Sequence, residues 1–389
     1  MSKDKVCSFI DENKDYLFRI SKEIHENPEL GFEEFKASKL LADELKKAEF
    51  KVELGVADLD TAILAVHPKE SEGPVVAILA EYDALPEIGH ACGHNLIATA
   101  ALGASLAIGS LKSEIPGKLI FMGTPAEEGG GGKIYMINAG LFKNVDAAMM
   151  FHPSSIYNMV GRGGLAIVEV KMEFFGKSAH ASSQPEKGIN ALDAVIQTFN
   201  SISALRQHIP SDARIHGIIS HGGVKPNIVP DYASASFYVR ALDDNYCQEL
   251  VNKVEKCAKG AALSTGAKLK FERMGHSYRS RNVNRTLGEA FLENLKTLEI
   301  PIRPIPPGSG LGSSDIGNVS HEVPTIHPYI GISETEINGH SKDFTAASIS
   351  EFGQNRMVVA AKALAMTALD VFTKPELLAK AKEEFEKEK

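Results

Sequence analysis

Residues 74–95 read PVVAILAEYDALPEIGHACGHN, and this stretch organises the rest of the chain. Residues 74–80 are an unbroken apolar run rich in β-branched side chains, which predicts a strand buried on both faces. Residues 96–111, rich in Ala, Leu and Ile, predict a buried helix. The polar residues between them follow the carboxyl end of a strand, where open α/β sheets build their sites. We therefore expect chemistry here, with Cys92 and His94 directed at one centre.

The remaining pattern alternates strands and helices. Two cover helices are predicted at 5–27 and 32–49, separated by Pro28 and Gly31. Strand-like runs follow at 62–66, 75–79, 118–122 and 147–151. Later segments predict a helix at 285–298, a strand at 325–330, a helix at 347–372 and a charged helical tail at 375–389. This order is typical of an α/β fold whose mostly parallel sheet is flanked by helices.

The pattern changes after Gly164, where a smaller domain is inserted. Its order is βαββαβ, with elements predicted at 165–175, 189–205, 215–219, 233–239, 245–263 and 268–274. That order is typical of a ferredoxin-like split βαβ domain. We expect a catalytic domain made of residues 1–164 plus 276–389, and an inserted domain at 165–275.

Composition limits the classes of function. The 389 residues carry 42 Lys and Arg against 50 Asp and Glu, a net charge of −8, which argues against nucleic-acid binding and a polybasic membrane anchor. The charged first residues lack an apolar signal region, and no apolar run approaches the length of a membrane span. Four cysteines are too few for a disulfide framework. We expect a cytoplasmic protein.

A second polar cluster, TPAEEGGGGK at 124–133, follows another predicted strand. Glu127 and Glu128 precede four glycines, which allow backbone to approach a ligand closely. The glycines and Lys133 also suggest a phosphate-binding loop. That alternative is weak, because Ile134 stands where such a loop needs Ser or Thr to hold magnesium.

Two more imidazoles complete the set of candidates. His152 closes an apolar run and His340 lies beside a turn, and each alone is more typical of a structural histidine. Taken with Cys92, His94 and Glu128, they supply the thiolate, imidazole and carboxylate donors that suit zinc and tolerate manganese. Because four of the five follow successive strands, one parallel sheet would gather them at one edge.

These motifs resemble a known family. HACGHN at 90–95, PAEE at 125–128 and the inserted βαββαβ domain resemble the aminoacylase and glutamate carboxypeptidase superfamily, metallopeptidase family twenty, in its amidohydrolase branch. The likeness is greatest to carnosine-type β-alanyl-lysine dipeptidases and the aminobenzoyl-glutamate hydrolase catalytic subunit. Two positions depart from the family pattern: Asn95 stands where the branch usually has Asp, and Glu81 where other branches have a metal-binding His.

The resemblance implies roles for the catalytic-domain residues. Cys92, His94, Glu128, His152 and His340 would hold two divalent metal ions, Zn²⁺ or Mn²⁺, with Glu127 as general base. Asp83 matches an acid that orients a ligand. The implied activity is hydrolysis of the amide bond of a dipeptide or N-acyl amino acid with a free carboxylate, through a metal-activated water. The alternative from another class is a non-catalytic metal-binding carrier or regulatory protein on the same fold.

The resemblance also implies roles outside the metal loops. His180 matches a histidine that reaches the active site of a partner subunit in a homodimer and stabilises the oxyanion. Asn227 and Arg240 match residues that hold the substrate carboxylate, and the guanidinium fork suits that group. The glycine-rich loop 308–315, with Gly310 and Ser313, is expected to line the same pocket, although a plain flexible loop is nearly as plausible.

Overall fold

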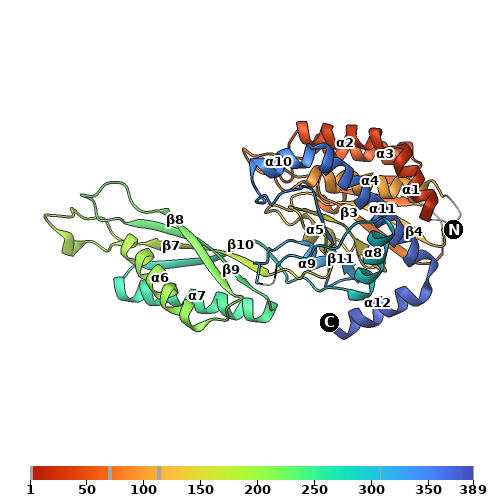
Figure 1. Ribbon diagram of the computed structural model, residues 1–389. Helices are drawn as coiled ribbons and strands as arrows, with labels where there is room; N and C mark the ends of the chain where they lie inside the picture. Colours follow the sequence, from red (N-terminus) through yellow and green to blue (C-terminus); the bar gives the residue numbers. More distant parts are fainter. Residues whose placement is uncertain (1–2, 69–71, 112–114, 307, 389) are drawn as a thin grey trace. The chain divides into compact units, whose positions relative to one another are not determined.

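The computed structural model describes residues 3–68, 72–111, 115–306 and 308–388. By its internal contacts the chain divides into two compact units, one made of residues 1–163 and 281–389 and the other of residues 164–280. Figure 1 shows the elements of each unit. Met1, Ser2 and Lys389, which belong to the charged ends considered above, lie outside the described residues.

The first unit is built on a six-stranded sheet of order β1-β2-β4-β3-β5-β11. Its strands are β1 Lys51–Leu54, β2 Ile63–His67, β3 Val75–Ala80, β4 Lys118–Gly123, β5 Ala147–Met149 and β11 Thr325–Ile326. The pairs β4–β3, β3–β5 and β5–β11 are parallel, whereas β1–β2 and β2–β4 are antiparallel. The α/β fold with a mostly parallel sheet is therefore confirmed.

The antiparallel direction of β2 has a simple cause. Only seven residues, 68–74, connect β2 to β3. A parallel connection needs a crossover of a dozen residues or more, so the chain must return in the opposite direction. The short strand β1, which the sequence pattern did not predict, pairs with β2 at the edge of the sheet.

Ten helices of the described residues surround this sheet. They are α1 Lys3–Glu12, α2 Lys14–Glu26, α3 Phe35–Lys47, α4 His94–Gly109, α5 Gly132–Asn138, α8 Arg285–Thr297, α9 Ile316–Val319, α10 Lys342–Ile349, α11 Glu351–Thr373 and α12 Pro375–Glu388. The predicted helix 5–27 is two helices, α1 and α2. Helix α4 packs on β3 and β4, and α1, α2 and α11 pack on α4. Because it is enclosed this way, α4 is buried along nearly its whole length.

Two chain segments pass from the central sheet to a second, two-stranded sheet. Of the predicted strand 147–151, only β5 pairs in the central sheet, and it ends at Met149. The next strand, β6 His152–Ser154, pairs in parallel with β12 Tyr329–Gly331. Likewise the predicted strand 325–330 divides into β11 and β12, with Pro328 between them. The two chain segments leave the central sheet together, which places His152 opposite Tyr329.

The second unit is a four-stranded antiparallel sheet of order β10-β7-β9-β8 with two helices. Its elements are β7 Ala166–Phe175, α6 Ala191–Leu205, β8 Arg214–His221, β9 Tyr232–Ala241, α7 Asp244–Thr265 and β10 Lys268–Tyr278. Alternate residues of β7 are buried against α6 and α7, as the sequence alternation predicts. Strand β10 runs to Tyr278, so this unit ends a few residues beyond the boundary expected at 275.

Three short 3₁₀ turns complete the secondary structure of the described residues: η1 Val56–Asp58, η3 Pro185–Lys187 and η4 Arg206–His208. Each helix within the described ranges is too short or too polar to span a lipid bilayer.

Candidate metal centre

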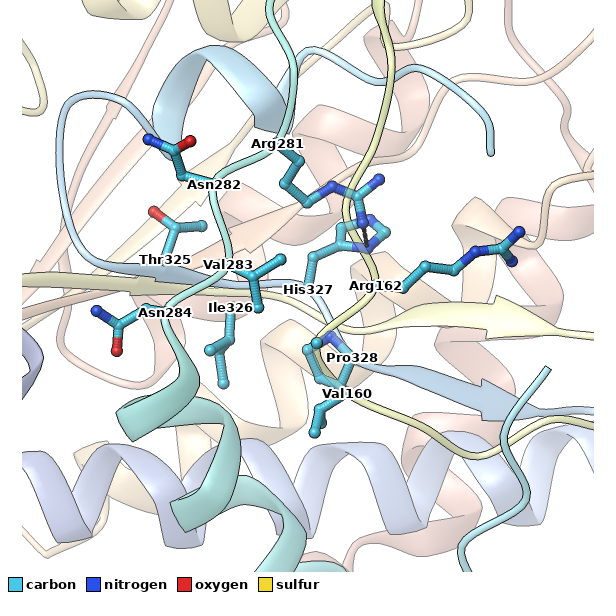
Figure 2. Close-up of a pocket in the computed structure, with 11 residues that line it drawn as sticks. Val160, Arg162, Arg281, Asn282, Val283, Asn284, Thr325, Ile326, His327 and Pro328 are labelled. Atoms are coloured by element: carbon cyan, nitrogen blue, oxygen red, sulfur yellow. Dashed lines mark hydrogen bonds between the residues drawn. The ribbon is translucent and has the colours of Figure 1, made fainter. Parts of the chain in front are cut away.

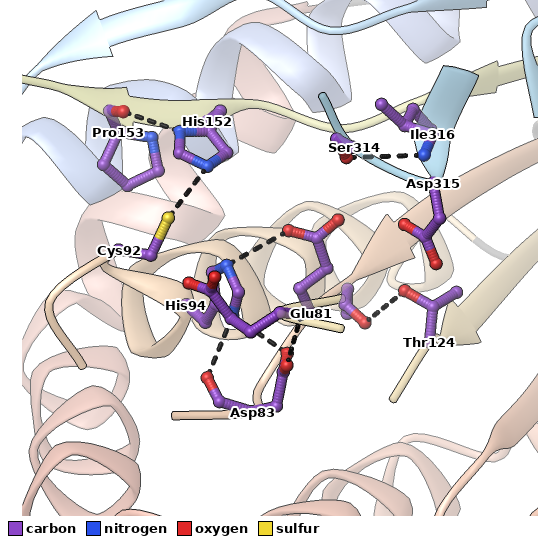
Figure 3. Close-up of polar contacts among 12 residues, drawn as sticks. Glu81, Asp83, Cys92, His94, Thr124, His152, Pro153, Ser314, Asp315 and Ile316 are labelled. Atoms are coloured by element: carbon purple, nitrogen blue, oxygen red, sulfur yellow. Dashed lines mark hydrogen bonds and ion pairs between the residues drawn. The ribbon is translucent and has the colours of Figure 1, made fainter. Parts of the chain in front are cut away.

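The polar residues after β3 and β4 meet at the carboxyl ends of these neighbouring parallel strands. Glu81 and Asp83 follow β3, and Glu127 and Glu128 follow β4. Cys92 and His94 lie at the start of α4, the helix that follows β3 in the chain, and His152 begins β6. Figure 3 shows Cys92, His94 and His152 facing one another above Asp83.

A glycine allows Cys92 and His94 to approach the other ligands. Gly93 lies between them with a φ of +78°, a conformation that a residue with a side chain rarely adopts. A Cβ at this position would also lie 2.8 Å from Cγ of Pro153. Glycine therefore allows the loop to turn tightly against β6, which carries His152.

The Asp83 carboxylate orients two of the predicted ligands. Its Oδ1 accepts a hydrogen bond from Nδ1 of His94 at 2.9 Å, and its Oδ2 accepts one from the backbone N–H of Glu128 at 2.9 Å. Because Nδ1 of His94 donates, its Nε2 keeps a lone pair for a metal. Burial tends to raise the pKa of Asp83, but the interaction with His94 and the hydrogen bond from the Glu128 backbone outweigh it and lower the pKa.

The predicted ligand atoms form two overlapping groups. One atom each from Cys92, His94 and His152 lie within 4.8 Å of one another, and so do those of Cys92, Glu128 and His340. Sγ of Cys92 is 3.4 Å from Nε2 of His152, and Nε2 of His340 is 3.7 Å from Oε1 of Glu128. The structure thus brings all five predicted ligands together, with Cys92 common to both groups.

Two buried atoms test whether these residues suit a metal ion. Within the described part of the chain, Nε2 of His94 and Oε1 of Glu128 are buried and have no hydrogen-bond partner, although Glu81 Oε2 lies 3.5 Å from the first and His340 Nε2 3.7 Å from the second. Such buried orphan atoms are unfavourable unless a ligand satisfies them. Nitrogen, oxygen and sulfur donors around a common space fit a divalent transition metal or zinc.

The protonation states of the Cys92 thiol and the His152 imidazole agree with a metal site. Burial raises the pKa of the Cys92 thiol, so a thiolate at this position needs a cation beside it. Burial lowers the pKa of His152 to about 4, which leaves its ring neutral. Since Nδ1 of His152 lies 2.7 Å from the Pro153 carbonyl oxygen and donates to it, Nε2 is the nitrogen available to a metal ion.

Glu127 lies at the junction of this centre and a third group of carboxylates. A carboxylate oxygen of Glu127 lies within 4.8 Å of ligand atoms of His94 and Glu128. A carboxylate oxygen of Glu127 also lies within 4.8 Å of carboxylate oxygens of Glu81 and Asp315. Burial, reinforced by the negative charges of Glu81, Glu128 and Asp315, raises its pKa well above the ordinary value. A buried carboxylate with a raised pKa beside the ligands is suited to accept and pass on a proton.

The sequence analysis did not predict the association of Lys133 with Glu81 and Asp315. Nζ of Lys133, which is completely buried, lies 2.6 Å from Oε1 of Glu81 and 2.6 Å from Oδ1 of Asp315. The two carboxylates hold the Lys133 ammonium, which agrees with the rejection of the phosphate-loop alternative on account of Ile134. Asp315 is 182 residues away in sequence, so only the fold could reveal the pair.

The other predicted residues lie in different surroundings. His340 adopts a φ of +54° and is the most exposed ligand candidate, with 58% of its side chain accessible. Gly310 and Ser313 lie in the loop that leads to Asp315, and the Gly310 carbonyl accepts a hydrogen bond from Arg162. Asn95 donates to Ser21 and to the Ser348 carbonyl, a structural role away from the ligand groups.

His180, Asn227 and Arg240 belong to the second unit. The Asn227 carbonyl accepts a hydrogen bond from Ala181, which brings the His180 and Asn227 segments together beyond the Tyr232 end of β9. Arg240 lies at the other end of β9, opposite Ile167. Eight residues of strand separate Tyr232 from Arg240, roughly 25 Å at the rise of an extended chain. The structure therefore does not bring Arg240 together with His180 and Asn227 within one copy.

Comparisons with known proteins place the chain in a family. Residues 160–265 match the family described as peptidase dimerisation domain. The Xaa-Arg dipeptidase of Mus musculus is 42% identical over 98% of this chain and 92% of its own length. The chain belongs to the M20 peptidase family. The resemblance drawn from the sequence, and with it the expectation of a hydrolase acting on peptide or amide bonds, is confirmed.

Two further M20 relatives extend the comparison. A p-aminobenzoyl-glutamate hydrolase chain of Escherichia coli K12 is 35% identical, over 72% of this chain and 62% of its own length. A crystal structure from Bacillus subtilis, described as a dinuclear metal binding peptidase from the M20 family, superposes with a TM-score of 0.72. It is 22% identical and covers 93% of this chain and 99% of its own, a likeness of fold.

If Cys92 is a metal ligand, Cys92→Ser should lower the affinity for Zn²⁺ by more than the ~10–100-fold typical of losing a supporting partner of a ligand. The measurement is metal content per chain after dialysis against a graded series of chelator. In the wild type, thiol reagents should modify Cys92 faster after metal removal, since coordination masks the sulfur. Cys7→Ser, in helix α1, is the control. Equal metal retention by Cys92→Ser and wild type would contradict the assignment.

If Lys133 neutralises the carboxylate pair, Lys133→Met should destabilise the protein strongly. The substitution leaves Glu81 and Asp315 buried without their cation, which typically costs about 3–5 kcal/mol. The midpoint of thermal unfolding measures the loss. Lys143→Met, which removes an exposed lysine of the same unit, should leave it unchanged. A Lys133→Met midpoint within the scatter of that control would show that the pair is not stabilising.

Proposed function

We propose that this M20 peptidase is a metal-dependent amidohydrolase that cleaves the amide bond of a dipeptide or N-acyl amino acid with a free carboxylate. The observation that carries the proposal is the meeting of Cys92, His94, Glu128, His152 and His340 around buried orphan donor atoms, with Glu127 beside them. The names of the relatives, Xaa-Arg dipeptidase and p-aminobenzoyl-glutamate hydrolase, support the substrate class.

The chemistry is divided between metal ligands and a base. The five ligands would hold two divalent ions, Zn²⁺ or Mn²⁺, and Cys92 belongs to both ligand groups. Ions bound there would polarise the scissile carbonyl and lower the pKa of water. Glu127 accepts the proton of the attacking water and delivers it to the leaving nitrogen, which is otherwise too basic to depart. Asp83 keeps His94 and the Glu128 backbone in place throughout.

Substrate binding draws on the loop before Asp315 and on the second unit. Gly310 and Ser313 lie in a loop whose end is anchored beside the centre by the Asp315–Lys133 pair. Asn227 and Arg240 supply an amide and a guanidinium that suit a carboxylate. His180 would donate to the oxyanion, since the metal loops provide a base but no separate donor of this kind.

We further propose that the active site is shared between two copies of the chain. Arg240 lies roughly 25 Å from the His180 and Asn227 segments along β9, so one copy would not present all three to one small substrate. Strand β8 at the edge of the sheet exposes Ile218 and Ile219, at 66% and 45% accessible. An exposed apolar edge strand is suited to pairing with a second copy. In a two-fold dimer each copy would place its His180 in the active site of the other copy.

The role of Glu127 predicts that Glu127→Gln abolishes turnover and leaves the metals bound. Loss of a general base typically slows a reaction by ~10²–10⁴-fold. The assay is hydrolysis of a panel of dipeptides and N-acyl amino acids with added Zn²⁺ or Mn²⁺, alongside metal content. Glu128→Gln is the matched variant, and it should lose metal instead. Metal loss in Glu127→Gln would mean that the two roles are reversed, and hydrolysis of no substrate by the wild type would refute the proposed activity.

The shared site predicts complementation between two inactive variants. His180→Ala should lose ~10²–10³-fold in turnover, the scale of removing one oxyanion donor. When it is mixed with Glu127→Gln in equal amounts and subunits exchange, half the dimers are hybrids with one intact site each. About a quarter of wild-type activity should then return, by counting intact sites. An active monomer, or confirmed exchange without recovery, would rule out action of His180 across an interface.

A further inference from the structure

Two arginines reach the same tyrosine next to the metal centre. The guanidinium carbons of Arg162 and Arg281 each lie 5.9 Å from the ring centre of Tyr329. Nη1 of Arg281 donates to Nδ1 of His327 at 2.7 Å and to the Tyr329 hydroxyl at 3.3 Å. These residues come from three separate segments, 160–162, 281–284 and 325–329. Figure 2 shows Arg162, Arg281 and His327 among the side chains that line one pocket.

The charges of this pocket are unbalanced. Within the described ranges of the chain, neither Arg162 nor Arg281 forms an ion pair with a carboxylate, and Nε of Arg281 is buried without a hydrogen-bond partner. Partly buried guanidinium groups are normally paired, because an unpaired buried charge is unfavourable. The guanidinium groups of Arg162 and Arg281 both lie beside the Tyr329 ring, and neither is paired with a carboxylate of the described residues. They therefore form a positively charged site that a bound anion would neutralise.

His327 adds a donor to the same pocket. Its Nδ1 accepts from Arg281, so its proton is on Nε2. That Nε2 is buried and has no hydrogen-bond partner within the described part of the chain. Arg162, Arg281 and His327 therefore offer hydrogen-bond donors, which match the oxygens of a carboxylate.

The pocket lies beside the metal centre. The ring centre of His152 lies 5.2 Å from that of His327 and 5.6 Å from that of Tyr329. The parallel pairing of β6 with β12 holds His152 opposite Tyr329. A group bound at the arginines is therefore separated from a proposed metal ligand by a single layer of rings.

We propose that the arginine pocket, formed by Arg162, Arg281, His327 and Tyr329, binds a carboxylate of the substrate. This rests on the proposed function, which supplies a substrate carrying such a group at the adjacent centre. The carboxylate has two possible sources: an acidic side chain on the last residue of the substrate, or its chain terminus, in which case the pocket and not Asn227 and Arg240 would hold that group. Both share one chemistry, and matched substrates separate them.

Three dipeptides test the pocket in the metal-loaded full-length protein: Ala-Glu, Ala-Gln and Ala-Gln amide. Ala-Glu against Ala-Gln isolates the side-chain carboxylate, and Ala-Gln against its amide isolates the terminal one. A hydrogen-bonded charged group contributes about 1.5–3 kcal/mol, so the wild type should prefer the substrate with the recognised carboxylate by roughly 10–150-fold in kcat/KM. In Arg281→Met and Arg162→Met that preference should collapse, mainly through KM, with the carboxylate-free partner hydrolysed as before.

Two further variants make the outcome specific. Arg281→Lys keeps the positive charge but loses the planar guanidinium that can donate two parallel hydrogen bonds. It should therefore show part of the preference that Arg281→Met loses. Arg285→Met removes an exposed arginine at the start of α8 and should change neither ratio. Collapse of the Ala-Glu preference assigns the side-chain carboxylate, and collapse of the acid-over-amide preference assigns the terminal one. Retention of both preferences in both methionine variants would overturn the proposal.

A binding measurement separates this inference from the proposed function. Glutarate carries carboxylates and no amide bond, so calorimetric titration tests the pocket without turnover. We expect glutarate to bind the wild type and Glu127→Gln equally, and Arg281→Met at least 10-fold more weakly. If the wild type hydrolyses no peptide, the proposed function fails while the titration still decides the pocket. Equal glutarate binding by wild type and Arg281→Met would count against the pocket whatever the activity.

Discussion

The structure depends most on an excess of buried negative charge at the carboxyl ends of β3 and β4. Glu81, Asp83, Glu127, Glu128 and Asp315 converge there. Lys133 neutralises part of the cluster through its ion pairs with Glu81 and Asp315. More carboxylates than cations remain. Carboxylates held in a dry space are unfavourable unless paired, and divalent metal ions supply the missing charge.

The same charge organises the loops around it. Asp83 joins the loop after β3 to the loop after β4 by holding both His94 and the Glu128 backbone. Lys133 joins the start of α5 to Asp315 and so fixes the end of the glycine-rich loop. Across the pairing of β6 with β12, His152 meets Tyr329, and through it the arginine pocket. Negative groups that would bind metal ions thus lie beside positive groups that would bind a carboxylate.

The sequence predicted the parts of this site that local pattern encodes. A buried strand followed by polar residues and a small-residue helix predicted the loop of Cys92 and His94, and the alternation in β7 predicted the second unit. It could not predict contacts between distant segments. The pairing of Lys133 with Asp315 could not be predicted, because 182 residues separate them along the chain. The division of 325–330 into two strands was missed because it depends on which neighbour each half pairs with.

Anomalous diffraction at the zinc absorption edge, from crystals of the zinc-loaded protein, tests the central claim most directly. Two peaks are expected, with Cys92 Sγ adjacent to both, one bounded by His94 and His152 and the other by Glu128 and His340. Glu127 should lie beside the peaks without ligating either ion. A peak among Glu81, Glu127 and Asp315 in place of Lys133, or no ordered zinc near Cys92, would contradict the account.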